Sequence, residues 1–186
     1  MPALILASTS PYRRALLERL RIPFEVIRPQ VPEDHLPGEA PLQRARRLSL
    51  AKARAVAERH PGAVVIGSDQ VAALGDHILD KPGDAATCRG QLAALSGRTA
   101  HFFTGCAVGD ETHVDTTSVI FRRLGAEEIE RYVGVEQPFD CAGGFKVEAL
   151  GISLFERVES NDPTALIGLP LIWLAGALRA AGFRIP

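Results

Sequence analysis

Apolar and polar residues recur along this 186-residue chain with two periods, one typical of strands and one typical of helices. Short apolar or alternating runs predict strands over residues 3–7, 24–28, 63–74, 99–108, 112–122 and 152–158. Apolar residues at helical spacing predict helices that start near residue 11 and over residues 41–60, 85–95, 126–133 and 166–181. Because strands and helices interleave, with a hairpin through Gly109-Asp110, we expect an α/β domain with a mixed sheet.

The polar segment after the first predicted strand has the sequence of a helix start. Ser10 has a side chain suited to an N-cap, and Pro11 suits the first helical position, where its missing N–H costs nothing. A helix start directs free backbone N–H groups and a positive dipole end at one spot, and Arg13 and Arg14 add charge there. The segment therefore fits a phosphate site or an ordinary capped helix with two solvated arginines, and the local pattern favours neither.

Asp69 is the most unusual residue of the predicted strand over residues 63–74. It lies between Ser68 and Gln70 inside an otherwise apolar run, where an unpaired carboxylate would be costly to bury. Either the strand ends in a turn at Gly67, or the carboxylate opens into a cleft with compensating charge. The apolar run resumes at Val71, which favours the cleft. A carboxylate in such a cleft can hold a divalent metal or orient an attacking water.

Other polar residues have ordinary explanations when each is taken alone. Lys52 lies on the long predicted helix and Lys81 on a loop after the strand, and isolated lysines are usually surface charges. The pair Gly143-Gly144 would let backbone approach a ligand closely, but a turn that needs positive φ is the preferred interpretation. Asp162 stands where a helix cap is usual.

Composition excludes several classes of function. The net charge of −1 provides no general basic field, so we expect no nucleic-acid partner. The three cysteines lie far apart and the five histidines form no cluster, so no zinc site is predicted. No run approaches the roughly 20 apolar residues of a membrane span. We therefore expect a single cytoplasmic domain, residues 1–186, that binds no membrane.

Six segments together resemble the Maf family of nucleotide pyrophosphatases. They fall in order and at family-like spacing between residues 3 and 172, which is nearly the whole chain. The segments are Leu4-Ile-Leu-Ala-Ser-Thr-Ser-Pro-Tyr-Arg-Arg-Ala-Leu-Leu17, Ile66-Gly-Ser-Asp-Gln70, Lys81-Pro82, Phe103-Thr-Gly105, Cys141-Ala-Gly-Gly-Phe-Lys146 and Asp162-Pro-Thr-Ala-Leu-Ile-Gly-Leu-Pro170.

The resemblance implies a fold and a reaction. Members of that family hydrolyse nucleoside triphosphates between the α and β phosphates, with a divalent metal such as Mg²⁺ or Mn²⁺. Their fold is an elongated mixed β-sheet flanked by helices, shared with the inosine triphosphatases, and it holds the nucleotide in a central cleft. They are commonly dimers, so the resemblance also implies a homodimer.

The resemblance assigns roles to individual residues. Asp69 matches the catalytic proton acceptor, and the phosphate-binding positions match Ser8, Arg13, Lys52 and Lys81. Glu33 matches an acidic position, so Glu33 and Asp69 are the candidate metal ligands. Pro32 stands where the family usually has aspartate, a departure that puts the metal or water contacts at that point in question.

Three further positions sort substrates within that family. Here they are Tyr12, Gln70 and Glu148, which look like the branch that acts on 7-methyl-GTP, although tryptophan is the usual aromatic residue where this chain has Tyr12. Methylation at N7 makes guanine cationic, so an aromatic face attracts it. Glu148 would accept hydrogen bonds from the guanine N1–H and amino group while balancing that charge.

The expected function is therefore hydrolysis of 7-methyl-GTP to 7-methyl-GMP and pyrophosphate, which clears a modified nucleotide from the cytosol. A pyrophosphatase for dTTP and UTP, or one of broad specificity, is the alternative among enzymes. An inosine-triphosphatase-like enzyme with the same architecture is another. A nucleotide-binding regulator of cell division is the alternative outside enzymes.

Overall fold

The structure, a computed structural model, describes residues 2–186, and within it the chain divides into two compact units. Unit 1 comprises the described residues up to Gln70 together with Phe103–Asp115 and Asp162–Pro186. Unit 2 comprises Val71–Phe102 and Thr116–Asn161. No helix within residues 2–186 is long and apolar enough to span a membrane.

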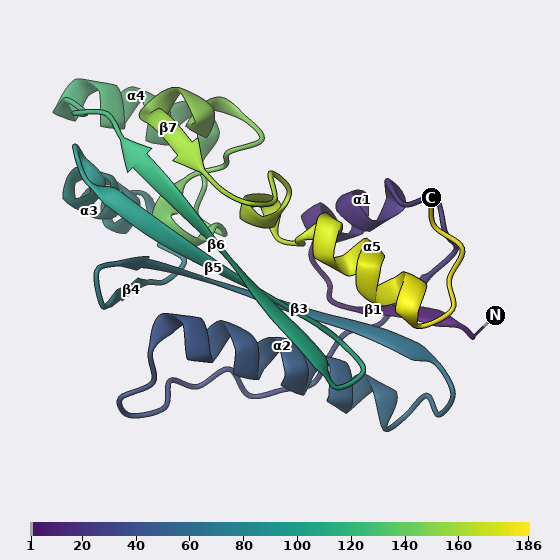
Figure 1. Ribbon diagram of the computed structural model, residues 1–186. Coiled ribbons are helices and arrows are strands. Elements are labelled where there is room, and N and C mark those ends of the chain that lie inside the picture. The colour runs from purple at the N-terminus through teal and green to yellow at the C-terminus, as the bar shows by residue number, and fades with distance from the viewer. Residues whose placement is uncertain (1) are drawn as a thin grey trace. The chain divides into compact units, whose positions relative to one another are not determined.

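Over residues 2–186 the secondary structure is a mixed seven-stranded sheet with five α-helices, so the α/β expectation is confirmed (Figure 1). The strands are β1 (Leu4–Ala7), β2 (Glu25–Val26), β3 (Val64–Leu74), β4 (His77–Leu79), β5 (Thr99–Val108), β6 (Glu111–Phe121) and β7 (Phe155–Glu159). The helices are α1 (Pro11–Glu18), α2 (Pro41–Ala57), α3 (Ala85–Leu95), α4 (Ala126–Glu136) and α5 (Leu171–Ala180). Short 3₁₀ helices cover Ala142–Gly144, Leu150–Leu154 and Ala165–Ile167.

The strands pair in the order β2-β1-β3-β5-β6-β7, and β4 pairs with β3 outside that path. β1 runs parallel to both β2 and β3, whereas β4 is antiparallel to β3 and β7 is antiparallel to β6. Parallel and antiparallel pairs in one sheet match the mixed sheet expected from the order of helical and strand patterns along the chain.

Two elements near the C-terminus begin later than the sequence predicts, and one short strand was not predicted. The strand expected over residues 152–158 begins at Phe155, because Leu150–Leu154 forms a 3₁₀ turn. The C-terminal helix expected over residues 166–181 begins at Leu171, because Pro170 precludes a continuous helix and Gly168 has φ 134°. β4 has three residues, which is too short for its alternation of apolar and polar residues to be recognised in the sequence. It pairs antiparallel with β3.

The core of unit 1 lies on both faces of β1. Leu4 and Leu6 face a cluster that includes Leu16 of α1 and Leu174 of α5. Ile5 and Ala7 point the other way, into a second cluster that includes Ala53 and Val56 of α2. The two-residue period of the strand therefore places α1 and α5 on one face of β1 and α2 on the other (Figure 1).

Two glycines allow α2 to lie directly on the strands of unit 1. A Cβ atom at Gly67 of β3 would lie 2.1 Å from the Ser49 carbonyl oxygen, and one at Gly105 of β5 would lie 2.2 Å from the Ala45 carbonyl oxygen. Both contacts are with helix backbone, which cannot turn aside as a flexible side chain can. The depth at which α2 packs therefore depends on the absence of side chains at these two positions.

Unit 2 is built around packed aromatic rings and two helices. α3 and α4 pack on each other, and Phe121, Phe145 and Phe155 form edge-to-face pairs with centroids 4.9–5.4 Å apart. Gly143 and Gly144 are buried with φ of 78° and 74°, so the turn interpretation of this pair is confirmed.

Gly67→Ala should destabilise the protein by about 3 kcal/mol, because the new methyl group overlaps the backbone of α2. Urea unfolding of the variant and the wild type measures the difference. Gly90→Ala is the matched control: Gly90 lies on α3 with open space around its Cβ position, and alanine there should add up to about 1 kcal/mol. Equal stability of the two variants would contradict the close packing of α2.

Candidate functional site

The start of α1 is capped as the sequence predicts. The Ser10 hydroxyl oxygen accepts a hydrogen bond from the Arg13 backbone N–H at 3.4 Å, and Pro11 occupies the first helical position. Ser8, buried at the end of β1, accepts a hydrogen bond from the Ser10 N–H at 3.2 Å. The hydroxyl side chains thus satisfy backbone donors at this helix start.

The two arginines of α1 have different environments. Arg14 is exposed and pairs with Glu18 one turn later, with 3.0 Å between Nε and Oε1, so the solvated interpretation is confirmed for this residue. Arg13 turns inward, and its Nε donates to the Gly168 carbonyl oxygen at 3.1 Å. Burial lowers the pKa of Arg13, and the nearby carboxylates of Asp69 and Glu33 partly oppose that effect.

Gly168 holds Arg13 in place. Its carbonyl oxygen also accepts a hydrogen bond from the buried Ser68 hydroxyl at 2.8 Å, so β3 and α1 are joined through one backbone atom. The φ of 134° is a conformation that residues with side chains rarely adopt, and a Cβ atom would lie 3.2 Å from the Arg13 Cγ. A side chain at residue 168 would therefore be strained and would crowd Arg13.

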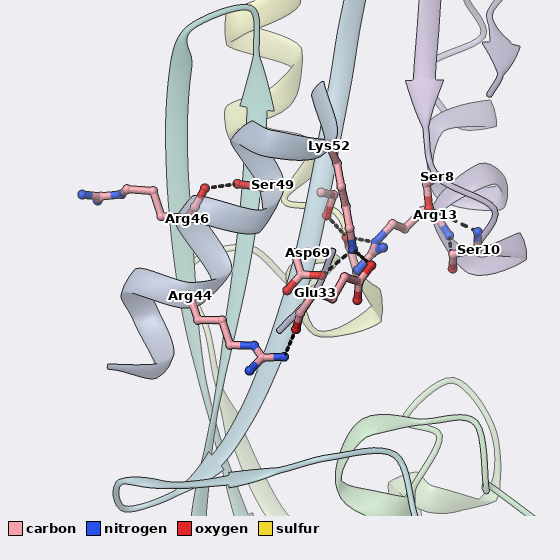
Figure 2. Close-up of polar contacts among 11 residues, drawn as sticks. Ser8, Ser10, Arg13, Glu33, Arg44, Arg46, Ser49, Lys52 and Asp69 are labelled. Atoms are coloured by element: carbon pink, nitrogen blue, oxygen red, sulfur yellow. Dashed lines mark hydrogen bonds and ion pairs between the residues drawn. The ribbon is translucent and has the colours of Figure 1, made fainter. Parts of the chain in front are cut away.

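Lys52, Asp69 and Glu33 form a compact charged cluster. The Lys52 Nζ lies 2.7 Å from Asp69 Oδ1 and 2.7 Å from Glu33 Oε1. The Lys52 and Asp69 side chains are 8% and 9% exposed, whereas Glu33 is 56% exposed. Figure 2 shows these three side chains and Arg13 directed toward one another from α2, β3, the loop over residues 30–40 and α1.

The environment of Asp69 decides between the two sequence interpretations. β3 runs without interruption from Val64 to Leu74, so the alternative of a turn at Gly67 is wrong. The buried carboxylate is compensated instead by the Lys52 ammonium. That pair engages Oδ1 of Asp69.

The loop over residues 30–40 is attached to α2 by arginines that the sequence prediction did not select. Arg44 Nη2 donates to the Glu33 carbonyl oxygen at 2.8 Å. Arg47 donates to the Asp34 carbonyl oxygen at 3.1 Å and to both carboxylate oxygens of Glu39 at 2.5 and 2.7 Å. The hydrogen bond from Arg47 lowers the pKa of Glu39. A signal was present: Arg44 precedes Leu48 by one turn on the buried face of α2, where a cation is unusual.

Gln70 and Tyr12, both predicted to select the nucleobase of the substrate, lie in unit 1. The Gln70 Nε2 lies 3.0 Å from the Thr104 hydroxyl, 3.2 Å from the Ala165 carbonyl oxygen and 2.9 Å from the Leu166 carbonyl oxygen. Its amide donors thus hold the 3₁₀ turn that precedes Gly168. Tyr12 is partly buried on the first turn of α1, next to Arg13.

The structure gathers most of the predicted site residues in unit 1. Ser8, Arg13, Glu33, Lys52, Asp69, Gln70 and Tyr12 all belong to it. Lys81 and Glu148 belong to unit 2, where both are exposed, and their predicted roles stay predictions.

The candidate ligands for a divalent metal are the carboxylates of Asp69 and Glu33. Within residues 2–186, no three His, Cys, Asp or Glu side chains gather into a metal-binding group. Asp69 and Glu33 nevertheless place two carboxylates around one ammonium nitrogen. Mg²⁺ is usually held by one or two carboxylates together with substrate phosphates and waters. The pair therefore fits a metal that is bound jointly with a phosphorylated substrate.

Comparison with known proteins identifies the family of this chain. A family model described as Maf-like protein matches residues 3–181. The chain belongs to the Maf-like protein family. A relative from Xanthomonas axonopodis pv. citri, named 7-methyl-GTP pyrophosphatase, is 55% identical and covers 100% of both chains. Relatives of that name from Aromatoleum aromaticum and Bordetella avium are each 53% identical to this Maf-like protein and cover 98% and 97% of it, and 97% and 94% of their own lengths.

Lys52→Met should destabilise this Maf-like protein by about 3–5 kcal/mol, because it leaves the Asp69 carboxylate buried without its cation. The double variant Lys52→Met/Asp69→Asn should recover part of that loss. Urea unfolding of the wild type, both single variants and the double variant measures the coupling between the two residues. Additive effects would show that the pair does not interact.

Proposed function

We propose that this protein is a nucleoside triphosphate pyrophosphatase that hydrolyses 7-methyl-GTP to 7-methyl-GMP and pyrophosphate. The observation that carries the proposal is the cluster of Lys52, Asp69 and Glu33. It lies beside Arg13, which belongs to the first turn of α1. Full-length relatives at 53–55% identity bear the name of this activity, which supports the choice of substrate.

The phosphates are the groups that the cations of unit 1 would bind. A triphosphate carries about four negative charges at neutral pH, and a partly desolvated guanidinium such as Arg13 binds phosphate oxygens strongly. The N-terminus of α1 contributes its positive dipole end, and Ser8 lies at that end. When phosphate oxygens approach Lys52, they compete with Glu33, which is the more exposed of its two carboxylate partners.

Asp69 is the proposed base. It accepts a proton from a water molecule whose oxygen attacks the α-phosphorus, and the bond from that phosphorus to the bridging oxygen breaks to release pyrophosphate. Lys52 keeps the carboxylate in a fixed orientation through Oδ1, and proton transfer to a held carboxylate is efficient. A Mg²⁺ or Mn²⁺ ion held by Asp69 and Glu33 would supply charge neutralisation at the phosphates.

The nucleobase is recognised by residues other than the proposed proton acceptor. We propose that Tyr12 stacks on the cationic 7-methylguanine ring, and that Glu148 accepts hydrogen bonds from its N1–H and amino group. Lys81 is the remaining proposed phosphate ligand. The homodimer stays a prediction from the family resemblance, and the cytoplasmic location stays a prediction from the composition.

A panel of triphosphates tests the function. Pyrophosphate release from 7-methyl-GTP, GTP, dTTP, UTP and ITP, with Mg²⁺ or Mn²⁺, should give the highest kcat/KM for 7-methyl-GTP, by about 10-fold over GTP. Asp69→Asn is the matched inactive control, isosteric with aspartate, and should lose at least about 100-fold in kcat while still binding nucleotide.

The other outcomes of the panel correspond to the alternative functions. Preference for dTTP or UTP would make the protein a pyrimidine-type pyrophosphatase, and equal activity on ITP would make it inosine-triphosphatase-like. A cellular phenotype that survives Asp69→Asn would indicate a nucleotide-binding regulator.

The preference for the methylated base should depend on the aromatic ring at position 12. Tyr12→Leu should reduce the ratio of kcat/KM for 7-methyl-GTP over GTP about 5-fold, because it removes the cation–π attraction and leaves the phosphate contacts in place. Tyr12→Trp, which keeps an aromatic face, should preserve the ratio. An unchanged ratio in Tyr12→Leu would remove Tyr12 from base recognition. Competition between the two nucleotides in one reaction measures the ratio directly.

A further inference from the structure

Arg44 is a buried cation for which the proposed reaction has no role. It lies on α2 and is 8% exposed. Nη2 donates to the Glu33 carbonyl oxygen at 2.8 Å, whereas Nη1 is enclosed and has no hydrogen-bond acceptor within residues 2–186. An enclosed guanidinium nitrogen without an acceptor is costly, so Arg44 is a poor choice for stability alone.

The bond that Arg44 makes is to a residue of the charged cluster. Arg44 and Lys52 are two turns apart on the same buried face of α2. Arg44 binds the backbone of Glu33, and Lys52 binds its carboxylate at 2.7 Å. One helix therefore holds Glu33 at both ends, as Figure 2 shows.

Glu33 has no regular structure to position it. It lies between β2, which ends at Val26, and α2, which begins at Pro41. Pro32 before it cannot donate a backbone hydrogen bond. The hydrogen bonds from α2 are thus what defines the place of the Glu33 carboxylate beside Lys52 and Asp69.

We propose that Arg44 is a positioning residue, which holds the Glu33 backbone so that the Glu33 carboxylate meets the Lys52–Asp69 pair. The proposal rests on the proposed function, because it makes this cluster the hydrolytic centre. Arg44 touches neither the reacting phosphorus nor the water, and its effect on the reaction passes through Glu33.

Arg44→Met tests the proposal, with Arg46→Met as the matched control. Arg46 lies on the same helix and its side chain is exposed. The Ser49 hydroxyl donates to the Arg46 backbone carbonyl oxygen, a contact that a side-chain substitution leaves in place. Arg46→Met therefore removes the same charge without affecting Glu33. Amide hydrogen exchange over residues 30–40 should become about 10-fold faster in Arg44→Met and stay unchanged in Arg46→Met. The Tm of Arg44→Met should remain within about 3 °C of the wild type, because the substitution also removes a buried donor without an acceptor.

The kinetic arm is a double-mutant cycle with Glu33→Gln. Arg44→Met should lower kcat/KM for 7-methyl-GTP about 10- to 100-fold in the wild-type background, the usual effect of losing a residue that orients a reacting group. In the Glu33→Gln background the same change should have almost no further effect. Arg44→Lys keeps a donor for the Glu33 carbonyl oxygen and should recover part of the activity. If Arg44→Met folds poorly, Arg44→Lys takes its place in the double-mutant cycle.

Each other outcome has a definite meaning. An equal loss in both backgrounds would show that Arg44 acts independently of Glu33 and would overturn the proposal. Unchanged exchange over residues 30–40 would overturn it as well. If the wild type does not hydrolyse 7-methyl-GTP but exchange still accelerates in Arg44→Met alone, the attachment of the loop stands and the proposed function fails.

Discussion

Lys52 and Asp69 are both more than nine-tenths buried, and neither charge could remain there without the other. The ion pair joins α2 to β3, so it links the helix packing of unit 1 to the chemistry of its charged residues. The backbone of α2 also lies very close to the strands at this contact. Gly67 and Gly105 permit that approach, since a methyl group at either position would overlap the backbone of α2. The buried ion pair and the close backbone packing therefore join the same helix and strand.

The residues around this pair are oriented mainly by backbone atoms. The Gly168 carbonyl oxygen orients Arg13, and the Glu33 carbonyl oxygen binds Arg44. Gln70, selected from the sequence as a specificity residue, donates to backbone carbonyls of the turn before Gly168. A carbonyl oxygen is present at every residue, so a sequence motif does not show which one a side chain will bind. This explains why Gly168 and Arg44 were not selected while Asp69 and Lys52 were.

The prediction was most accurate where local signals were strong. The boundaries of α3 and β5 agree with the expected ranges, and Ser10 caps α1 as its side chain and the following proline indicate. It was least accurate near the C-terminus, where an apolar run continues across Gly168 and Pro170 although the helix begins only after them. Hydrophobic periodicity reports which residues are buried, and both a 3₁₀ turn and a helix can bury the same run.

The sequence by itself determined the order of helices and strands apart from β4, the capped start of α1 and the anomaly of a carboxylate within a buried strand. Those features depend on neighbouring residues, whose effects act over a few positions. Only the tertiary structure decided that Asp69 faces Lys52, that Arg13 turns inward while Arg14 stays in solvent, and that Arg44 binds the Glu33 backbone. These are contacts that side chains make with distant or loop segments, or with solvent, and short-range sequence patterns do not determine them.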